Sequence, residues 1–449
     1  MRKPCASWRR YFWEGQQLND NVEKTVPEDA DFLDKVLIRH RKYVAFLVPF
    51  AIMQMIWWVT AFRFDWFTLY ETRWQMPVVM FFGSTVAGMT SEGGGAVAFP
   101  VMTLLLQIDP SVARDFSLII QSAGMTCAMC VVLIMQIQIE KRAILFGTLG
   151  SVPGFVIGSV LLDEHLSAAE KKMLFVSIWS SFAIALFILN AQHNRRTYDV
   201  IPQFNFWKAT VLFFTGFVGG IFTAFAGSGV DICTFSIITL LFRVSEKTAT
   251  PTSVVLMGIN TMVGVYFRAV WEGDVPALAW EYAAVSVPVA VTMAPLGSFL
   301  GSHLHRQVLA GCIYVLEAAA LIGFLLTRPS TILILQGTII IFMSFAFFTS
   351  IAKIGEKLIE DVNGEELSLG RDSYIEKIRI RSKSTILQEP SNMINLCFFK
   401  AVENLCPTEA VEWREGEGKG KRILGEMSIE AERRTGRMEK YNLVACVLR

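Results

Sequence analysis

Long apolar segments separated by short polar stretches fill most of the chain between residues 43 and 350. A helix needs about 20 apolar residues to cross a bilayer, so each uninterrupted segment of that length is a predicted span. Two other apolar segments, 77–106 and 207–242, are each interrupted by a glycine cluster. The pattern predicts an all-α polytopic membrane protein. Its uninterrupted spans are expected near residues 43–62, 115–138, 143–162, 171–190, 251–270, 279–301, 306–326 and 331–350.

The two glycine clusters occupy matching positions in two copies of one unit. The first is Gly93-Gly94-Gly95, and the second is Gly227-Ser228-Gly229. A repeat that interrupts an apolar segment at the same point in both halves is typical of secondary transporters. An offset of 136 residues superposes Gly93 on Gly229, Phe99 on Phe235, Thr103 on Thr239, Ala113 on Ala249 and Ser117 on Ser253.

The repeat predicts how the chain is organised. Each repeat has one broken segment followed by three spans, and one extra span lies at each end. The polar ends carry most of the charge, so both are expected on the cytoplasmic side, the C-terminal one as a disordered tail. The predicted parts are an N-terminal segment (1–42), a first span and loop (43–76), repeat 1 (77–190), a linker (191–206), repeat 2 (207–326), a last span (327–352) and the tail (353–449).

Each half of a broken segment is expected to have about 10–14 residues, too few to span a bilayer alone. If both segments turn back, each repeat has three crossings and the second repeat is inverted. The basic loops around Lys141, Arg195 and Arg243 then share the cytoplasmic side, as the positive-inside tendency favours, whereas Lys171 and Lys172 oppose it. We therefore expect eight full spans and two re-entrant hairpins. Ten spans are the alternative.

An interrupted helix inside a membrane must satisfy its backbone amides with protein, water or a ligand. The half-helix after the interruption presents free N–H groups and a partial positive charge, which together bind anions. The other interpretation is that the glycines only permit close helix packing. The predicted substrate-binding residues are Thr90, Ser91, Gly93, Gly94, Gly95, Gly227, Ser228 and Gly229.

Two acids lie beside the interruptions, Glu92 in the first and Asp231 in the second. Acidic residues at membrane depth are costly and are functional candidates, so both are candidates for proton coupling. The alternative is that they cap the half-helices. Gln121 and Asn260 lie inside later spans, where they either line the transport path or form interhelical hydrogen bonds.

Composition narrows the possible functions. Of the 449 residues 53% are hydrophobic and only 18% are charged, which excludes a soluble domain. The net charge of +1 gives no indication of a nucleic-acid partner. No metal or other cofactor is expected, because Cys127 and Cys130 have no second ligand pair nearby. A serine hydrolase built on Ser228 would need a base at membrane depth, so we expect no enzyme.

The chain resembles the sulfite exporter TauE/SafE family of membrane proteins. The resemblance rests on Gly93–Thr103, Asp109–Leu118, Gly227–Gly229 and Ala249–Ser253, and it covers roughly residues 77–326. It implies transport of small sulfur-containing anions such as sulfite or organosulfonates. We therefore expect a multi-pass secondary transporter of small anions, with proton coupling as an option. An anion channel and a membrane scaffold or receptor without transport are the alternatives, and the oligomeric state stays open.

Overall fold

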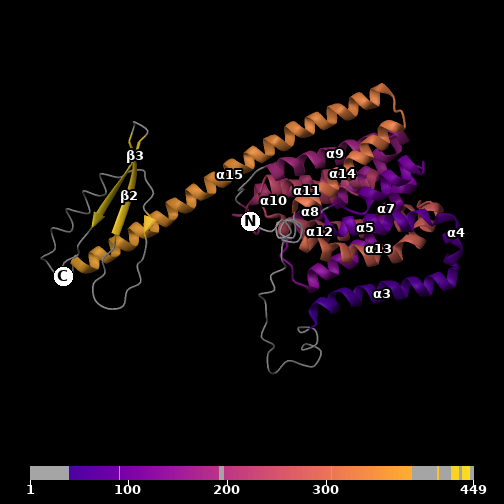
Figure 1. Ribbon diagram of the computed structural model, residues 1–449, viewed down its shortest axis with the longest axis horizontal. Helices are drawn as coiled ribbons and strands as arrows, with labels where there is room; N and C mark the ends of the chain where they lie inside the picture. Colours follow the sequence, from indigo (N-terminus) through magenta and orange to yellow (C-terminus); the bar gives the residue numbers. More distant parts are fainter. Residues whose placement is uncertain are drawn as a thin grey trace, which may run out of the picture. The chain divides into compact units, whose positions relative to one another are not determined.

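The computed structural model describes residues 40–90, 92–191, 197–304, 306–386, 412–413, 426–433 and 437–444. The chain divides into two compact units, residues 1–361 and 362–449. Helices make up the described part of the first unit, where the membrane-spanning bundle lies (Figure 1). The predicted N-terminal segment lies almost wholly outside the described residues, and so do residues 192–196 of the linker.

The first repeat follows a long N-terminal helix, α3 (Arg41–Phe64), and two short helices, η1 (Trp66–Thr68) and α4 (Leu69–Arg73). Its last long helices begin with side-chain caps, because Asp109 accepts from the amide of Ser111 before α7 and Glu140 accepts from the amide of Arg142 before α8. The elements of repeat 1 are α5 (Gln75–Met89), α6 (Gly95–Pro100), the π-helix η2 (Val101–Leu105), α7 (Pro110–Ile134), α8 (Lys141–Ile157), the π-helix η3 (Gly158–Leu162), η4 (Asp163–His165) and α9 (Ala168–Ala191).

The second repeat has its five α-helices in the same order as the first, but its π-helix follows the third of them. Its first helix ends at Gly227, whose φ of 79° is a left-handed conformation that glycine adopts readily. The elements of repeat 2 are α10 (Phe206–Ala226), α11 (Val230–Leu240), α12 (Glu246–Tyr266), the π-helix η5 (Phe267–Glu272), α13 (Ala277–His303) and α14 (Arg306–Leu326). The last helix of the chain, α15, runs over Thr331–Ile386.

Within the described residues, nine helices are long and apolar enough to cross a membrane. Eight of them correspond to the predicted spans, which confirms the multi-pass helical architecture. The ninth is α10, the first half of the second broken segment. It has 21 residues, so the expected length of about 10–14 residues is wrong for this half.

The two repeats pack against each other in a reciprocal way. Helix α5 packs along α13, and its counterpart α10 packs along α8. A Cβ on Gly88 would lie 1.9 Å from the carbonyl oxygen of Ala294, and a Cβ on Gly158 would lie 2.7 Å from the Cβ of Ala224. The 136-residue offset relates the two pairs, because Gly88 is equivalent to Ala224 and Gly158 is equivalent to Ala294. Contacts of this kind are expected of two units related by a two-fold axis.

Equivalent helices α7 and α12 lie side by side and run in opposite directions. Gly264 of α12 lies against Leu118 of α7, whereas Gly258, earlier in α12, lies against Met125, later in α7. Helices equivalent by repeat would run parallel if both repeats had the same orientation. The antiparallel pair supports the predicted inversion.

The second broken segment ends beside the point where it begins. The amide of Tyr198 donates to the carbonyl oxygen of Arg243 at 2.9 Å, and the amide of Ser245 donates to that of Tyr198 at 2.8 Å. A segment that crossed the membrane once would leave its ends on opposite faces. These hydrogen bonds therefore support the re-entrant hairpin over the ten-span alternative for this segment.

The second unit holds a three-stranded antiparallel sheet in the order β1-β2-β3. Its strands are β1 (Glu412–Trp413), β2 (Glu426–Arg433) and β3 (Arg437–Val444). Glu412 pairs with Ser428, and Glu426 pairs with Val444. The predicted disorder of residues 353–449 stays a prediction, although α15 and this sheet give part of that stretch regular secondary structure.

Candidate functional site

Gln121 of α7 joins the two interruptions. We call residues 90–94 the first break and Gly227–Gly229 the second break. The Gln121 side-chain amide donates to the carbonyl oxygen of Gly227 at 2.9 Å. Its Oε1 lies so close to Gly93 that an added Cβ there would be 1.9 Å away. Only 2% of Gln121 is exposed, so the two breaks meet in the protein interior.

Two more residues complete the contact between the breaks. Met257 of α12 lies between them, since its sulfur is 3.9 Å from Ser228 Oγ and would be 2.6 Å from a Cβ on Gly93. Ser117 of α7, one turn before Gln121, lies against Gly227 and Gly95. The breaks therefore share a wall formed by α7 and α12, the helices that pack as an antiparallel pair.

The first break places backbone donors at the start of a helical stretch. The amides of Gly93, Gly94 and Gly95 donate no hydrogen bond to any of the described residues, which leave out Ser91. They precede a helical stretch of Gly95–Leu105, so its partial positive charge adds to theirs. Successive unpaired amides at such a point form an anion-binding concavity. Thr90 is 3% exposed and donates to the carbonyl oxygen of Val86 at 2.9 Å, which commits its hydroxyl hydrogen.

The second break is occupied by its own acid. Asp231 accepts from the amide of Gly229 at 3.0 Å and from the hydroxyl of Ser228 at 3.1 and 3.2 Å. Its carboxylate thus caps the N-terminus of α11, which is the alternative that the sequence left open for this residue. Its placement makes the two breaks unequal, because donors of the second are bonded to Asp231 whereas the amides of Gly93, Gly94 and Gly95 have no acceptor within the described part of the chain.

The surroundings of Glu92 are the opposite of those of Asp231. It is 1% exposed, and both of its carboxylate oxygens lack a hydrogen-bond partner among the described residues. It lies within electrostatic range of Asp231 and of Glu317 on α14. Ser91, the neighbouring predicted binding residue, lies outside the described residues.

Asn260 does not join this cluster of contacts. It donates to the carbonyl oxygen of Leu256 at 2.7 Å and accepts a hydrogen bond from Ser151 of α8. Its amide therefore ties α12 to α8, in keeping with the interhelical alternative. A role for Asn260 in lining the path stays a prediction.

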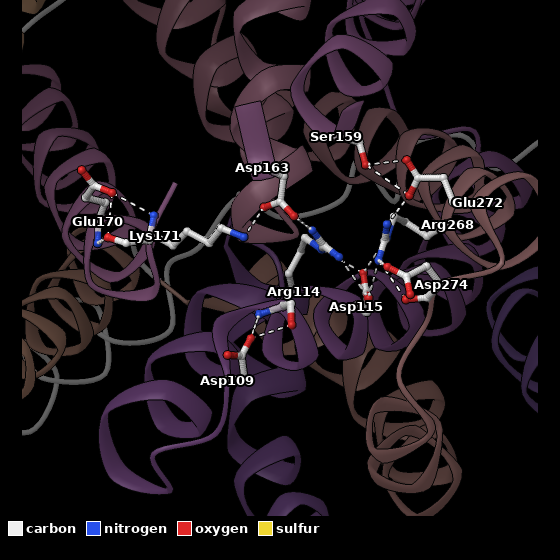
Figure 2. Close-up of polar contacts among 12 residues, drawn as sticks. Asp109, Arg114, Asp115, Ser159, Asp163, Glu170, Lys171, Arg268, Glu272 and Asp274 are labelled. Carbon is white, nitrogen blue, oxygen red and sulfur yellow. Dashed lines mark hydrogen bonds and ion pairs between the residues drawn. The ribbon is translucent and has the colours of Figure 1, made fainter. Parts of the chain in front are cut away.

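A buried ion-pair network lies at the end of the bundle where α7 begins and the π-helix η5 ends (Figure 2). Asp115 lies at its centre, 2.8 Å from Arg114 Nε and 3.2 Å from a terminal nitrogen of Arg268. Arg114 is 1% exposed, so it does not extend to the surface as a loop arginine would.

The network extends in two directions from Asp115 (Figure 2). Arg114 also pairs with Asp163, which Lys171 contacts at 2.6 Å, and Arg268 pairs with Glu272, which accepts from Ser159. These contacts join the starts of α7 and α9 to η3 and η4, which follow α8, and to η5, which follows α12. The 136-residue offset places Thr250 and Pro251 at the positions of Arg114 and Asp115, so the second repeat lacks this pair of charges.

Asp109, just before α7, stays charged at this end. Burial raises the pKa of its carboxyl, but hydrogen bonds from Ser111 and the charges of Lys171 and Lys172 outweigh burial, so the pKa lies below its ordinary value. Its negative charge interacts favourably with the partial positive charge at the N-terminus of α7.

Sequence reasoning missed Ser117, Met257, Arg268 and Glu317 as parts of these clusters. A signal was present for Glu317, since it is a lone acid inside an apolar span. No signal singled out Met257, because a methionine in an apolar helix is ordinary packing. Arg268 is 153 residues from Asp115, and one sequence does not reveal which distant charges will pair.

A polytopic helical protein with two matched interruptions meeting in its interior has the architecture of a membrane transporter. The family model described as sulfite exporter TauE/SafE matches residues 76–324, more than half of the chain. The protein belongs to the sulfite exporter TauE/SafE family. It is therefore a multi-pass protein of a family of membrane exporters. No curated protein and no solved structure matches the chain.

Proposed function

We propose that the protein is a secondary carrier that moves a small sulfur oxyanion, such as sulfite or an organosulfonate, through the contact between the two breaks. The observation that carries this proposal is the set of amides at Gly93, Gly94 and Gly95 beside Gln121, which have no acceptor among the described residues. A compact oxyanion presents several acceptor oxygens, which three neighbouring N–H groups can satisfy together. Family membership supports the sulfur chemistry.

Gln121 is the residue that holds this geometry. Both of its amide hydrogens are committed, one to the carbonyl oxygen of Ser117 and one to that of Gly227. It therefore positions the second break against the first and does not itself donate to the anion. Its removal would leave the buried Gly227 carbonyl without this donor, at a cost of about 1–3 kcal/mol.

The test is counterflow in liposomes containing the purified full-length protein. Labelled sulfite, thiosulfate, methanesulfonate and sulfate are offered in turn. We expect the wild type to exchange at least one sulfur oxyanion with saturable kinetics. Gln121→Ala removes the hydrogen bond to Gly227. If its loss raises the barrier to exchange by about 1.4 kcal/mol or more, exchange should slow about ten-fold or more. Ser122→Ala, a change of the next residue on α7, should not.

Three results would contradict the proposal. Absence of exchange for all four anions would support the scaffold or receptor alternative. Flux that fails to saturate and approaches free diffusion would support the channel. Equal exchange by the Gln121→Ala and Ser122→Ala proteins would remove the site from the contact between the breaks.

A further inference from the structure

Glu317 adds a third carboxyl to the neighbourhood of the first break. It is 4% exposed and lies on α14. Its neighbours Leu316 and Ala320 line a cavity with Ala96 of α6, which places this turn of α14 beside the start of the helix that follows Glu92. The two carboxyls of Glu317 and Glu92 are close enough to interact electrostatically.

The buried side-chain atoms without partners at this point are mostly acceptors. Among the described residues, both carboxylate oxygens of Glu92, Oε2 of Glu317 and Oε1 of Gln121 lack a hydrogen-bond donor. Each of the three residues is more than nine-tenths buried. Unpaired buried acceptors are costly, and a donor or a cation must satisfy them. The composition of the cluster therefore indicates a positively charged ligand.

No protein cation supplies that charge within the described part of the chain. Asp231 on α11 and Glu317 on α14 are the charged groups that act on Glu92, and Glu92 is the one that acts on Glu317. Ser117 and Gln121 of α7 and Met257 of α12 are uncharged. The guanidinium of Arg114, earlier on α7, is committed to Asp115 and Asp163.

Asp231 differs from the other two carboxyls because its oxygens already accept hydrogen bonds from Ser228 and Gly229. These donors stabilise its charged form, whereas Glu92 has none. An unpaired buried carboxylate costs several kcal/mol, and two adjacent ones add mutual repulsion. One proton bound to either Glu92 or Glu317 removes much of that cost.

We propose that Glu92 and Glu317 share the proton that is coupled to substrate movement, with Asp231 acting as a fixed cap of α11. This inference rests on the proposed function, because it assumes that an anion binds at the first break. A carboxylate at Glu92 would repel an anion on the adjacent amides, and a neutral carboxyl would not. Proton and anion therefore bind together, and the O–H bond formed on one side of the membrane breaks on the other side.

A proton suits this cluster better than a metal cation does. Among the described residues, no group of three or more histidine, cysteine, aspartate or glutamate side chains has the arrangement of a metal site. Na⁺ requires several oxygen ligands around one point, whereas a proton requires one carboxylate oxygen. A sodium gradient nevertheless forms a separate arm of the test.

The experiment uses the full-length protein in liposomes and the sulfur oxyanion that the wild type exchanges. Counterflow without a pH gradient measures substrate binding and translocation. Accumulation driven by an imposed pH gradient measures coupling. We expect Glu317→Gln to keep counterflow and lose pH-driven accumulation. Asp231→Asn should keep both, and Glu71→Gln, a change of an exposed acid on α4, is the matched control.

Wild-type pH-driven accumulation by the Glu317→Gln protein would overturn the inference. So would its selective loss in Asp231→Asn, or accumulation by the wild type driven by a sodium gradient and not by a pH gradient. If Glu317→Gln fails to fold, Glu317→Asp is tested in its place. We expect this variant to shift the pH profile of accumulation, and an unshifted profile contradicts the proposal. If the wild type shows no counterflow, the proposed function itself has failed.

Discussion

The spacing between Gly93 and Gln121 allows a sharp prediction for the substitution Gly93→Ala. The added Cβ would lie 1.9 Å from Gln121 Oε1, whereas ordinary contact begins at 3.4 Å, so the amide must move by about 1.5 Å. A shift of that size breaks the 2.9 Å hydrogen bond from Gln121 to Gly227. Its loss costs about 0.5–1.5 kcal/mol and overpacking adds about 1–3 kcal/mol, so we expect a destabilisation of about 2–4 kcal/mol.

The neighbouring glycine supplies the control. A Cβ on Gly94 would meet Met80 Cε at 3.2 Å, and that flexible methyl group can move aside. Thermal unfolding in detergent and counterflow in liposomes should therefore be impaired in Gly93→Ala and near normal in Gly94→Ala. Adding Gln121→Ala to Gly93→Ala should recover only part of the lost stability and should not restore transport, because it removes the clash with Oε1 but leaves the close approach to the Met257 sulfur and the loss of the bond to Gly227. Equal behaviour of the two alanine variants would refute the proposed contact between the breaks.

Two further predictions concern the ion-pair network and the topology. Arg268→Ala should destabilise the protein by up to about 3–5 kcal/mol, because it removes one of the two guanidinium partners of the buried Asp115 carboxylate. Arg73→Ala, at a partly exposed pair, should cost about 1 kcal/mol or less, and equal unfolding midpoints would contradict this. Single-cysteine variants of Asp199 and Lys247 should react with an impermeant thiol reagent from the same side of the membrane, and one of Asp274 from the opposite side. Labelling of Asp199→Cys and Lys247→Cys from opposite sides would show that the second broken segment crosses.

Much of the architecture could be predicted from the sequence because it depends on local patterns. The lengths of the apolar segments predicted the spans. The repeated glycine clusters predicted the interruptions at the positions where α5 and α10 end. The fixed offset also anticipated equivalent helices, since α7 and α12 occupy matching places. The length of α10 was not anticipated, although the apolar run from residue 207 to the glycine cluster at Gly227 is itself about as long as a full span.

The candidate site was only partly predictable. Gln121 was a candidate because an amide inside a span is conspicuous, but its bond to Gly227, 106 residues away, depends on how α7 and α10 pack. The different surroundings of Glu92 and Asp231 were also hidden. Each is an acid beside a glycine break, and only the backbone geometry shows that Asp231 folds back onto Gly229 while Glu92 does not.

The central claim is that an anion binds to the amides of Gly93, Gly94 and Gly95 beside Gln121. Cryo-electron microscopy of the full-length protein with selenite, a heavier analogue of sulfite, tests it most directly. We expect added density within hydrogen-bonding distance of the amides of Gly93, Gly94 and Gly95. Selenite density located elsewhere in the bundle, with those amides bonded to protein groups instead, would contradict the account.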